Sequence, residues 1–145
     1  FCHFLMKKKF EFLPHTADVI FRAYGITLEQ AFANAALATT AVMTEDTIKT
    51  RKEKKVSIIS VTKEALLYDF LEKLIYFVDT EGFLVGGVKH LTIVNKGNAY
   101  QLVAVLLGDS ADTYDVSMHI KAVTYSDMFI KEEKTGVTIQ VVHDI

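Results

Sequence analysis

Pro14-His15-Thr16-Ala17-Asp18 is the stretch of this sequence around which the rest of the chain is organised. It forms a short polar break between two apolar, strand-like runs, Phe10–Leu13 and Val19–Tyr24. Pro14 has no backbone N–H to donate to a sheet, and a proline biases the residue before it towards an extended backbone. The sequence therefore predicts two strands with a bend between them.

Carboxylates near the two ends of the chain form the candidate site. Asp18 closes the polar break, and Asp144 and the carboxylate of Ile145 end the sequence. If the last strand pairs near the first, three anionic oxygen groups converge, and such groups suit a hard cation such as Ca²⁺ or Mg²⁺. Asp144 continues the phase of Gln140, away from the apolar face of Ile139. On spacing alone the commoner alternative stays open, in which Asp18 accepts local backbone amides and Asp144 is a solvated tail.

Composition limits the classes to which the protein can belong. A chain of 145 residues, half of them hydrophobic and only one of them proline, predicts one packed domain. A formal net charge of −2 and a pI near 6.2 argue against a general nucleic-acid binder, which needs a basic field. The single cysteine, Cys2, cannot form an internal disulfide and fits a reducing cytoplasm. No apolar run approaches the roughly 20 residues that span a bilayer, so no membrane contact is expected.

The domain is expected to span residues 8–145. Met6-Lys7-Lys8-Lys9 resembles a natural start, and the residues before it lack the basic region and cleavage site of a signal peptide. We therefore interpret residues 1–7 as an extension or a disordered N-terminus.

Two helices are predicted by their caps. Thr27-Leu28-Glu29-Gln30 follows the capping-box pattern and opens a helix over Leu28–Met43. Thr62 caps a second helix that ends near Gly82. Its predicted core face recurs at three- and four-residue intervals and consists of Leu66, Leu67, Phe70, Leu71, Leu74, Ile75 and Val78.

The other segments read as strands and turns. Charged residues over Thr44–Lys55 predict an exposed connection, and Gly86-Gly87 predicts a sharp turn. Ala99–Leu107 is apolar on both faces, which is typical of a central strand covered on each side. The expected strands are Lys9–Leu13, Asp18–Tyr24, Val56–Val61, Val88–Val94, Ala99–Leu107, His119–Tyr125, Met128–Glu132 and Val137–Val142. The pattern predicts an α+β fold, a single compact domain with mostly antiparallel sheet and two main helices.

Several ordered segments resemble the archease family. They are Pro14–Asp18 with Phe21–Gly25, Thr27–Phe32 with Ala35-Ala36, Leu66–Gly82, Ile120–Tyr125 and the ending Asp144-Ile145. The likeness runs from about Lys8 to Ile145. It implies an archease-like fold and a non-catalytic activator of the RtcB-type RNA ligase. Such an activator promotes guanylylation of the ligase and its multiple turnover in tRNA splicing, and its contact with RNA is indirect, through the ligase.

The resemblance also implies site residues. A divalent cation, usually calcium, would be held by Asp18, Asp144 and Ile145. His15 is expected to orient the site or contact the partner, with a hydrogen-bonded structural histidine as the alternative. Lys121 matches a family lysine and is expected to act in ligase activation, with a solvated strand lysine as the alternative. Ser126 stands where the family generally has a histidine, which puts cation affinity or partner choice in doubt.

Two other functions compete with this interpretation. A metal-dependent phosphoester hydrolase would use His15 as base, but no nucleophile or oxyanion group accompanies the carboxylates. An RNA-binding or chaperone-like module is disfavoured by the acidic balance and by the lack of interleaved basic and aromatic residues.

Overall fold

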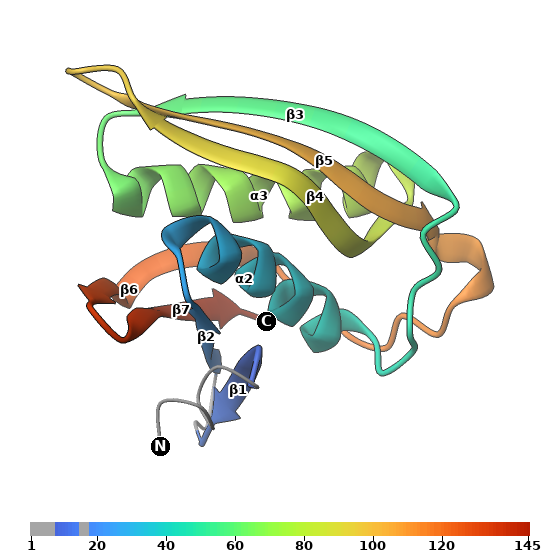
Figure 1. Ribbon diagram of the computed structural model, residues 1–145. Helices are drawn as coiled ribbons and strands as arrows, with labels where there is room; N and C mark the ends of the chain where they lie inside the picture. The colour runs from blue at the N-terminus through green and yellow to red at the C-terminus, as the bar shows by residue number, and fades with distance from the viewer. Residues whose placement is uncertain (1–7, 15–17) are drawn as a thin grey trace.

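Two helices lie between two antiparallel sheets in the computed structural model, which describes residues 8–14 and 18–145 (Figure 1). The four-stranded sheet has the order β1 (Phe10–Leu13), β2 (Val19–Gly25), β7 (Gly136–Asp144), β6 (Ala122–Glu133). The three-stranded sheet has the order β3 (Lys52–Ser60), β5 (Tyr100–Ser110), β4 (Phe83–Asn95). The helices are α2 (Leu28–Met43) and α3 (Lys63–Glu81), and a short 3₁₀ turn covers Ala111–Thr113. The predicted α+β class is confirmed.

Both helices begin and end close to their predicted bounds. The Thr27 hydroxyl accepts a hydrogen bond from the Gln30 backbone at 3.1 Å, and the Gln30 side chain accepts one from the Ile26 backbone at 2.6 Å. Thr62 caps α3 in the same way at 3.0 Å. Gly82 ends α3 in the left-handed conformation, with φ at 61°, which glycine adopts without steric cost. These caps satisfy backbone groups that a helix end leaves without partners.

The hydrophobic core fills the space between the two sheets. Because α2 is covered from both sides, it carries small residues that allow close approach, and four of its alanines are fully buried. Phe32 of α2 stacks on Phe70 of α3 with ring centroids 6.2 Å apart. The predicted core face of α3 is buried at Leu66, Leu67, Phe70, Leu71, Leu74 and Ile75 and half-buried at Val78. No helix among the described residues is long and apolar enough to cross a membrane.

The expected turn at Gly86-Gly87 is wrong. β4 runs through both glycines, with a change of register between Val85 and Gly87. A Cβ atom at Gly86 would lie 2.5 Å from the carbonyl oxygen of Ile48. Glycine therefore permits close approach of a neighbouring backbone here, which is the other common reason for a glycine inside a strand.

The prediction of an exposed connection over Thr44–Lys55 is wrong for its last four residues, which belong to a strand. Lys52–Lys55 is the first part of β3 and pairs with Val105–Gly108 of β5. Because β3 is an edge strand, its charged side chains remain accessible to solvent, and such charges protect edges from unwanted pairing. β5 is also longer than expected and continues to Ser110, because Asp109 and Ser110 pair with Leu84 and Phe83 of β4.

β6 also differs from its prediction. It is one strand and not two, because Ser126-Asp127 forms an irregularity inside it rather than a break. The register with β7 changes between Thr124 and Phe129, and Asp127 has φ at 55°. Its first residue is Ala122, so residues 119–121 lie outside the strand.

β5 is the central strand of the three-stranded sheet, as predicted. Leu102, Ala104 and Leu106 point towards the helices and are buried. The prediction that both of its faces are covered is wrong within the described chain, since Val103 on the outer face is 44% exposed. No described segment packs on that outer face, which is the upper surface in Figure 1.

Candidate metal centre

The early acidic residue and the end of the chain meet because β2 and β7 are neighbours (Figure 1). Their outermost paired positions are Val19 and His143. Asp18 directly precedes Val19 and Asp144 directly follows His143, and both aspartates are half-buried. The predicted approach of the last strand to the first strands is therefore observed, and the binding of a cation there stays a prediction.

The two aspartates continue the outer face of the four-stranded sheet. On this face Arg22 lies opposite Gln140, and the Arg22 Nε donates a hydrogen bond to the Gln140 side chain at 3.0 Å. Tyr24 donates a hydrogen bond to Glu11 across β1 and β2. Burial, and then the bond to Glu11, raise the pKa of Tyr24 to about 12, so its phenol remains a donor. Between these polar pairs and the aspartates, Ile20 lies opposite Val142 on the same face, so an apolar pair separates the two.

Lys121 and Ile145 complete this corner of the molecule. The Lys121 backbone N–H donates a hydrogen bond of 2.7 Å to the carbonyl oxygen of Asp144. This bond holds the last residue of β7 beside the residue that precedes β6. The Lys121 side chain is exposed and forms no ion pair with the described residues. Ile145 packs partly against the core. The backbone of Lys121 therefore lies beside Asp144 at the end of β7, whose neighbour β2 begins one residue after Asp18.

The predicted donors are carboxylate oxygens, which are the ligands that a hard divalent cation prefers. Binding of a cation by them stays a prediction. Within the described ranges no three His, Cys, Asp or Glu side chains gather closely enough to hold an ion. The predicted set contains two such side chains, Asp18 and Asp144, and takes its third donor from the carboxylate of Ile145. Oxygen donors of this kind suit calcium, which also accepts water and partner ligands.

His143 is a structural residue to which the sequence analysis assigned no role. It is fully buried on the opposite face of β7 from Asp144, and its ring centroid lies 5.3 Å from that of Phe21. Its Nε2 is 3.0 Å from the Thr39 hydroxyl, which itself donates to the Ala35 carbonyl of α2. Because the Thr39 hydroxyl uses its only proton in the bond to Ala35, it accepts a hydrogen bond from the protonated Nε2 of His143. The Nδ1 of the neutral ring then carries a lone pair.

The buried imidazole anchors the strand that ends in the candidate site. Its Nδ1 has no hydrogen-bond partner among the described residues. Burial lowers the pKa of His143 to about 4, so the ring is neutral near pH 7. The sequence did contain a signal, because His143 shares the phase of Ile139 and Val141, which are both fully buried.

Two further residues from the sequence analysis stand outside this corner. His15 lies outside the described residues, so its expected role stays a prediction. Ser126 is exposed in the irregular part of β6. The preceding Tyr125 is 54% exposed and stacks on Tyr68 of α3, with ring centroids 4.4 Å apart.

Comparisons of the whole sequence agree on one family. The profile of the Archease protein family (MTH1598/TM1083) matches residues 10–145. A protein archease from Aeropyrum pernix is 40% identical, with 90% of this chain and 93% of that protein covered. A protein archease from Pyrococcus furiosus is also 40% identical, with 89% and 92% covered.

Solved structures show the same fold. The solution structure of protein 1598 from Methanobacterium thermoautotrophicum is 34% identical, has a TM-score of 0.79, and matches 94% of this chain and 99% of that one. A crystal structure from Thermotoga maritima, described as an archease and possible chaperone, has a TM-score of 0.57 over 92% of this chain and 94% of that one. At 19% identity, the second shows likeness of fold alone.

Proposed function

This chain belongs to the archease family, and on that basis we propose that it is a non-catalytic protein cofactor of an RtcB-type RNA ligase. In this proposal it promotes guanylylation of the ligase by GTP and so permits multiple turnovers in tRNA splicing. The observation that supports the proposal is the antiparallel pairing of β2 with β7, which ends at Val19 and His143, next to Asp18 on one strand and Asp144 on the other.

The carboxylates of Asp18, Asp144 and Ile145 would hold a divalent cation, most readily calcium. A bound cation would supply positive charge at the edge of the sheet, where a phosphate or carboxylate of the ligase complex could approach it. The chain's own residues hold this edge rigid. His143 ties β7 to α2, and the Lys121 backbone ties β7 to β6.

Lys121 is proposed to meet an anionic group of the ligase complex. Lys121 is exposed, its backbone is bonded to Asp144, and its ammonium group forms no ion pair with the described residues. A lysine and a cation side by side attract a phosphate more strongly than either does alone, because their fields add. Contact with RNA would then pass through the ligase, in keeping with the formal net charge of −2.

The first test separates cation binding from ligase activation. Calcium binding to the full chain is measured by isothermal titration calorimetry for the wild type, Asp18→Asn and Asp144→Asn. Loss of one charged ligand should weaken binding by at least about tenfold, since each carboxylate supplies charge as well as a donor oxygen. Asp112→Asn, an exposed aspartate on the 3₁₀ turn, is the matched control and should bind as the wild type does.

The second test is a ligation assay with an RtcB-type ligase, GTP and a broken RNA substrate. The wild type and Asp112→Asn should convert a single turnover into many, and Asp144→Asn should not. A ligase that turns over equally well without the protein would refute the activator role. Retained activation by Asp144→Asn, together with lost calcium binding, would refute the part assigned to the cation.

A further inference from the structure

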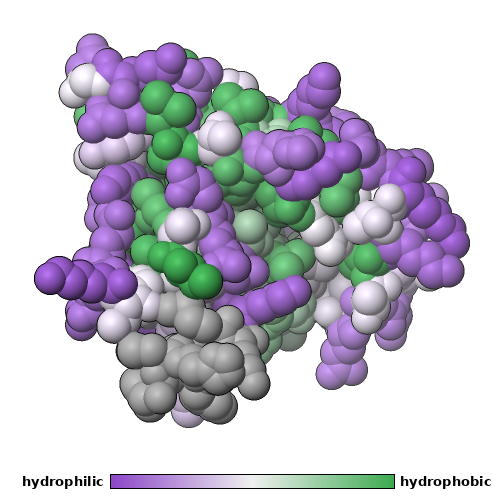
Figure 2. Space-filling model, in the orientation of Figure 1, coloured by the Kyte–Doolittle hydropathy of each residue, from purple (hydrophilic) through white to green (hydrophobic). Residues whose placement is uncertain are grey.

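The outer face of the three-stranded sheet carries an aliphatic patch. Val103 and Val105 of β5 point outwards, and Ile59 of β3 and Val94 of β4 stand on either side of Gln101. The exposed fractions are 64% for Ile59, 47% for Val94 and 44% for Val103. Figure 2 views this sheet from its side, and apolar residues reach the surface at the end near the β4–β5 hairpin. We define Ile59, Val94, Val103 and Val105 as the aliphatic patch.

A strand with apolar residues on both faces is typical of a sheet that is covered on both sides. In β5 the inner residues are covered by the two helices, and the outer ones are covered by no described segment. The outer face of the four-stranded sheet provides a comparison within the molecule. There the corresponding central positions carry Arg22 and Gln140, which hydrogen-bond to one another. Ile20 and Val142 stand on that same face but are half-buried and buried, respectively. The aliphatic patch therefore differs from the other open sheet face in its exposure to solvent.

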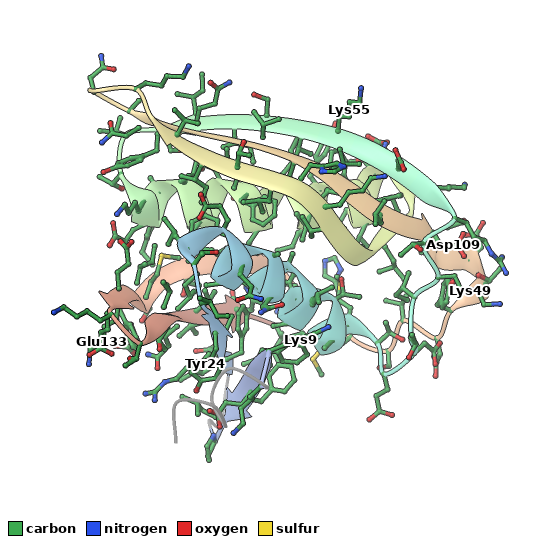
Figure 3. The ribbon with its side chains drawn as sticks, in the orientation of Figure 1. Lys9, Tyr24, Lys49, Lys55, Asp109 and Glu133 are labelled. Atoms are coloured by element: carbon green, nitrogen blue, oxygen red, sulfur yellow. The ribbon has the colours of Figure 1, made fainter. Side chains whose placement is uncertain are left out.

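Lysines bound the aliphatic patch at both ends. Lys55 lies opposite Val105, and Figure 3 shows it projecting from β3 away from α3. Lys96 lies at the other end, where its backbone N–H bonds to Ala99 at 2.7 Å. Neither ammonium forms an ion pair with the described residues, whereas Lys89 is paired with Glu53 at 2.8 Å. Between the two lysines, Ser57 and Thr92 flank Val103, and the Gln101 side chain donates a hydrogen bond to the Ser57 hydroxyl at 3.2 Å. The face therefore combines exposed aliphatic residues with small polar ones between positive charges at its two ends.

We propose that the aliphatic patch binds an acidic amphipathic helix of a partner protein. The face is roughly 14 Å wide and 30 Å long, from three strands at about 4.8 Å and nine residues at about 3.4 Å. A helix about 10 Å in diameter fits that width. The inner face of the same sheet already packs against α3, a helix of 19 residues. An apolar stripe on the partner would cover the aliphatic patch, and carboxylates at its ends would meet Lys55 and Lys96.

A second copy of this chain is disfavoured by charge, because two facing copies would bring the same lysines together. Single-stranded RNA is disfavoured as well, because sheets that bind it stack bases on aromatic side chains, and the aliphatic patch contains none.

The positions of the lysines specify the partner helix. From Val105, opposite Lys55, to Ala99, which precedes β5 and accepts the Lys96 N–H, is six residues, or roughly 20 Å of extended chain. At 1.5 Å per residue this corresponds to about 13 residues of helix. The helix should therefore carry acidic residues about 13 positions apart, with aliphatic residues between them at three- and four-residue intervals.

The test is a selection with the full 145-residue chain as bait. A phage-displayed library of helical peptides about 18 residues long keeps an aliphatic stripe fixed and varies the other positions among Glu, Gln and Lys. Selected peptides should carry Glu near both ends. By fluorescence anisotropy they should lose at least about tenfold in affinity for Ile59→Asp and for Lys55→Glu. Ile26→Asp is the matched control, because Ile26 is also 64% exposed but lies outside this sheet.

Several outcomes would overturn the proposal. One is that the wild-type chain enriches acidic peptides no more than the Ile59→Asp chain does in the same selection. Another is equal loss of affinity in Ile59→Asp and Ile26→Asp. Sedimentation that shows a dimer abolished by Ile59→Asp would assign the face to a second copy. Salt-sensitive binding of a single-stranded oligouridine that is lost in Lys55→Glu would assign it to RNA. Because the face lies on the other sheet from the candidate metal centre, none of these results depends on the cation.

Discussion

Acidification from pH 7 to pH 5 should destabilise the fold by about 2 kcal/mol through His143 alone. Burial lowers the pKa of this imidazole from 6.5 to about 4. Between these values the unfolded chain binds a proton that the folded chain excludes, so stability falls as the pH drops below 6.5 and stops falling near 4. At 1.36 kcal/mol per pKa unit the complete loss is roughly 3 kcal/mol, and about 2 kcal/mol of it has occurred by pH 5.

Urea unfolding followed by circular dichroism at both pH values measures this loss. The wild type is compared with His143→Leu, in the presence of a chelator so that no cation contributes. The leucine variant should be nearly independent of pH over this range, because the buried group no longer titrates. His90→Gln is the control, since His90 is exposed, and it should behave as the wild type does. If His143→Leu lost as much stability as the wild type between the two pH values, the assignment to this imidazole would be refuted.

Three further changes test the backbone and the end of the chain. Gly108→Ala should lower the free energy of unfolding by about 2 kcal/mol or more, because its Cβ would overlap the carbonyl oxygen of Leu84 on the paired strand. Thr62→Ala should cost about 1 kcal/mol in urea unfolding, since the hydroxyl caps α3 through the Ala65 amide. A tag fused after Ile145 should weaken calcium binding in calorimetry by at least about tenfold, whereas an N-terminal tag should not, because only the first removes a carboxylate donor.

Local signals in the sequence were enough for the helices. Thr27 and Thr62 are followed by helical patterns whose caps need no distant partner, and the structure has both helices within a residue or two of the expected bounds. A glycine can mark either a turn or a close approach of two backbones, and the sequence does not distinguish the two. Gly86 is the second case, since it lies against Ile48, which is distant in sequence. The polar pair at Ser126 likewise predicts a break between two strands. Because β6 is an edge strand, it continues through this irregularity as one strand.

The candidate site was predictable in part. The phase of the last strand placed Asp144 opposite the buried face of Ile139, and the structure agrees. The pairing of β2 with β7 follows from strand order, which no local pattern encodes. The phase of β7 indicates that His143 is buried, but its hydrogen bond with Thr39 joins residues 104 positions apart and could not be predicted.

The place of β7 between β2 and β6 has a consequence for biosynthesis. As the polypeptide emerges from the ribosome, β2 has an unsatisfied edge from its first appearance until residues 136–144 arrive to insert beside it. Non-local pairing of this kind is slow, and an exposed edge can recruit other nascent chains in the meantime. Truncation just before β7 should therefore yield aggregates rather than a smaller folded unit.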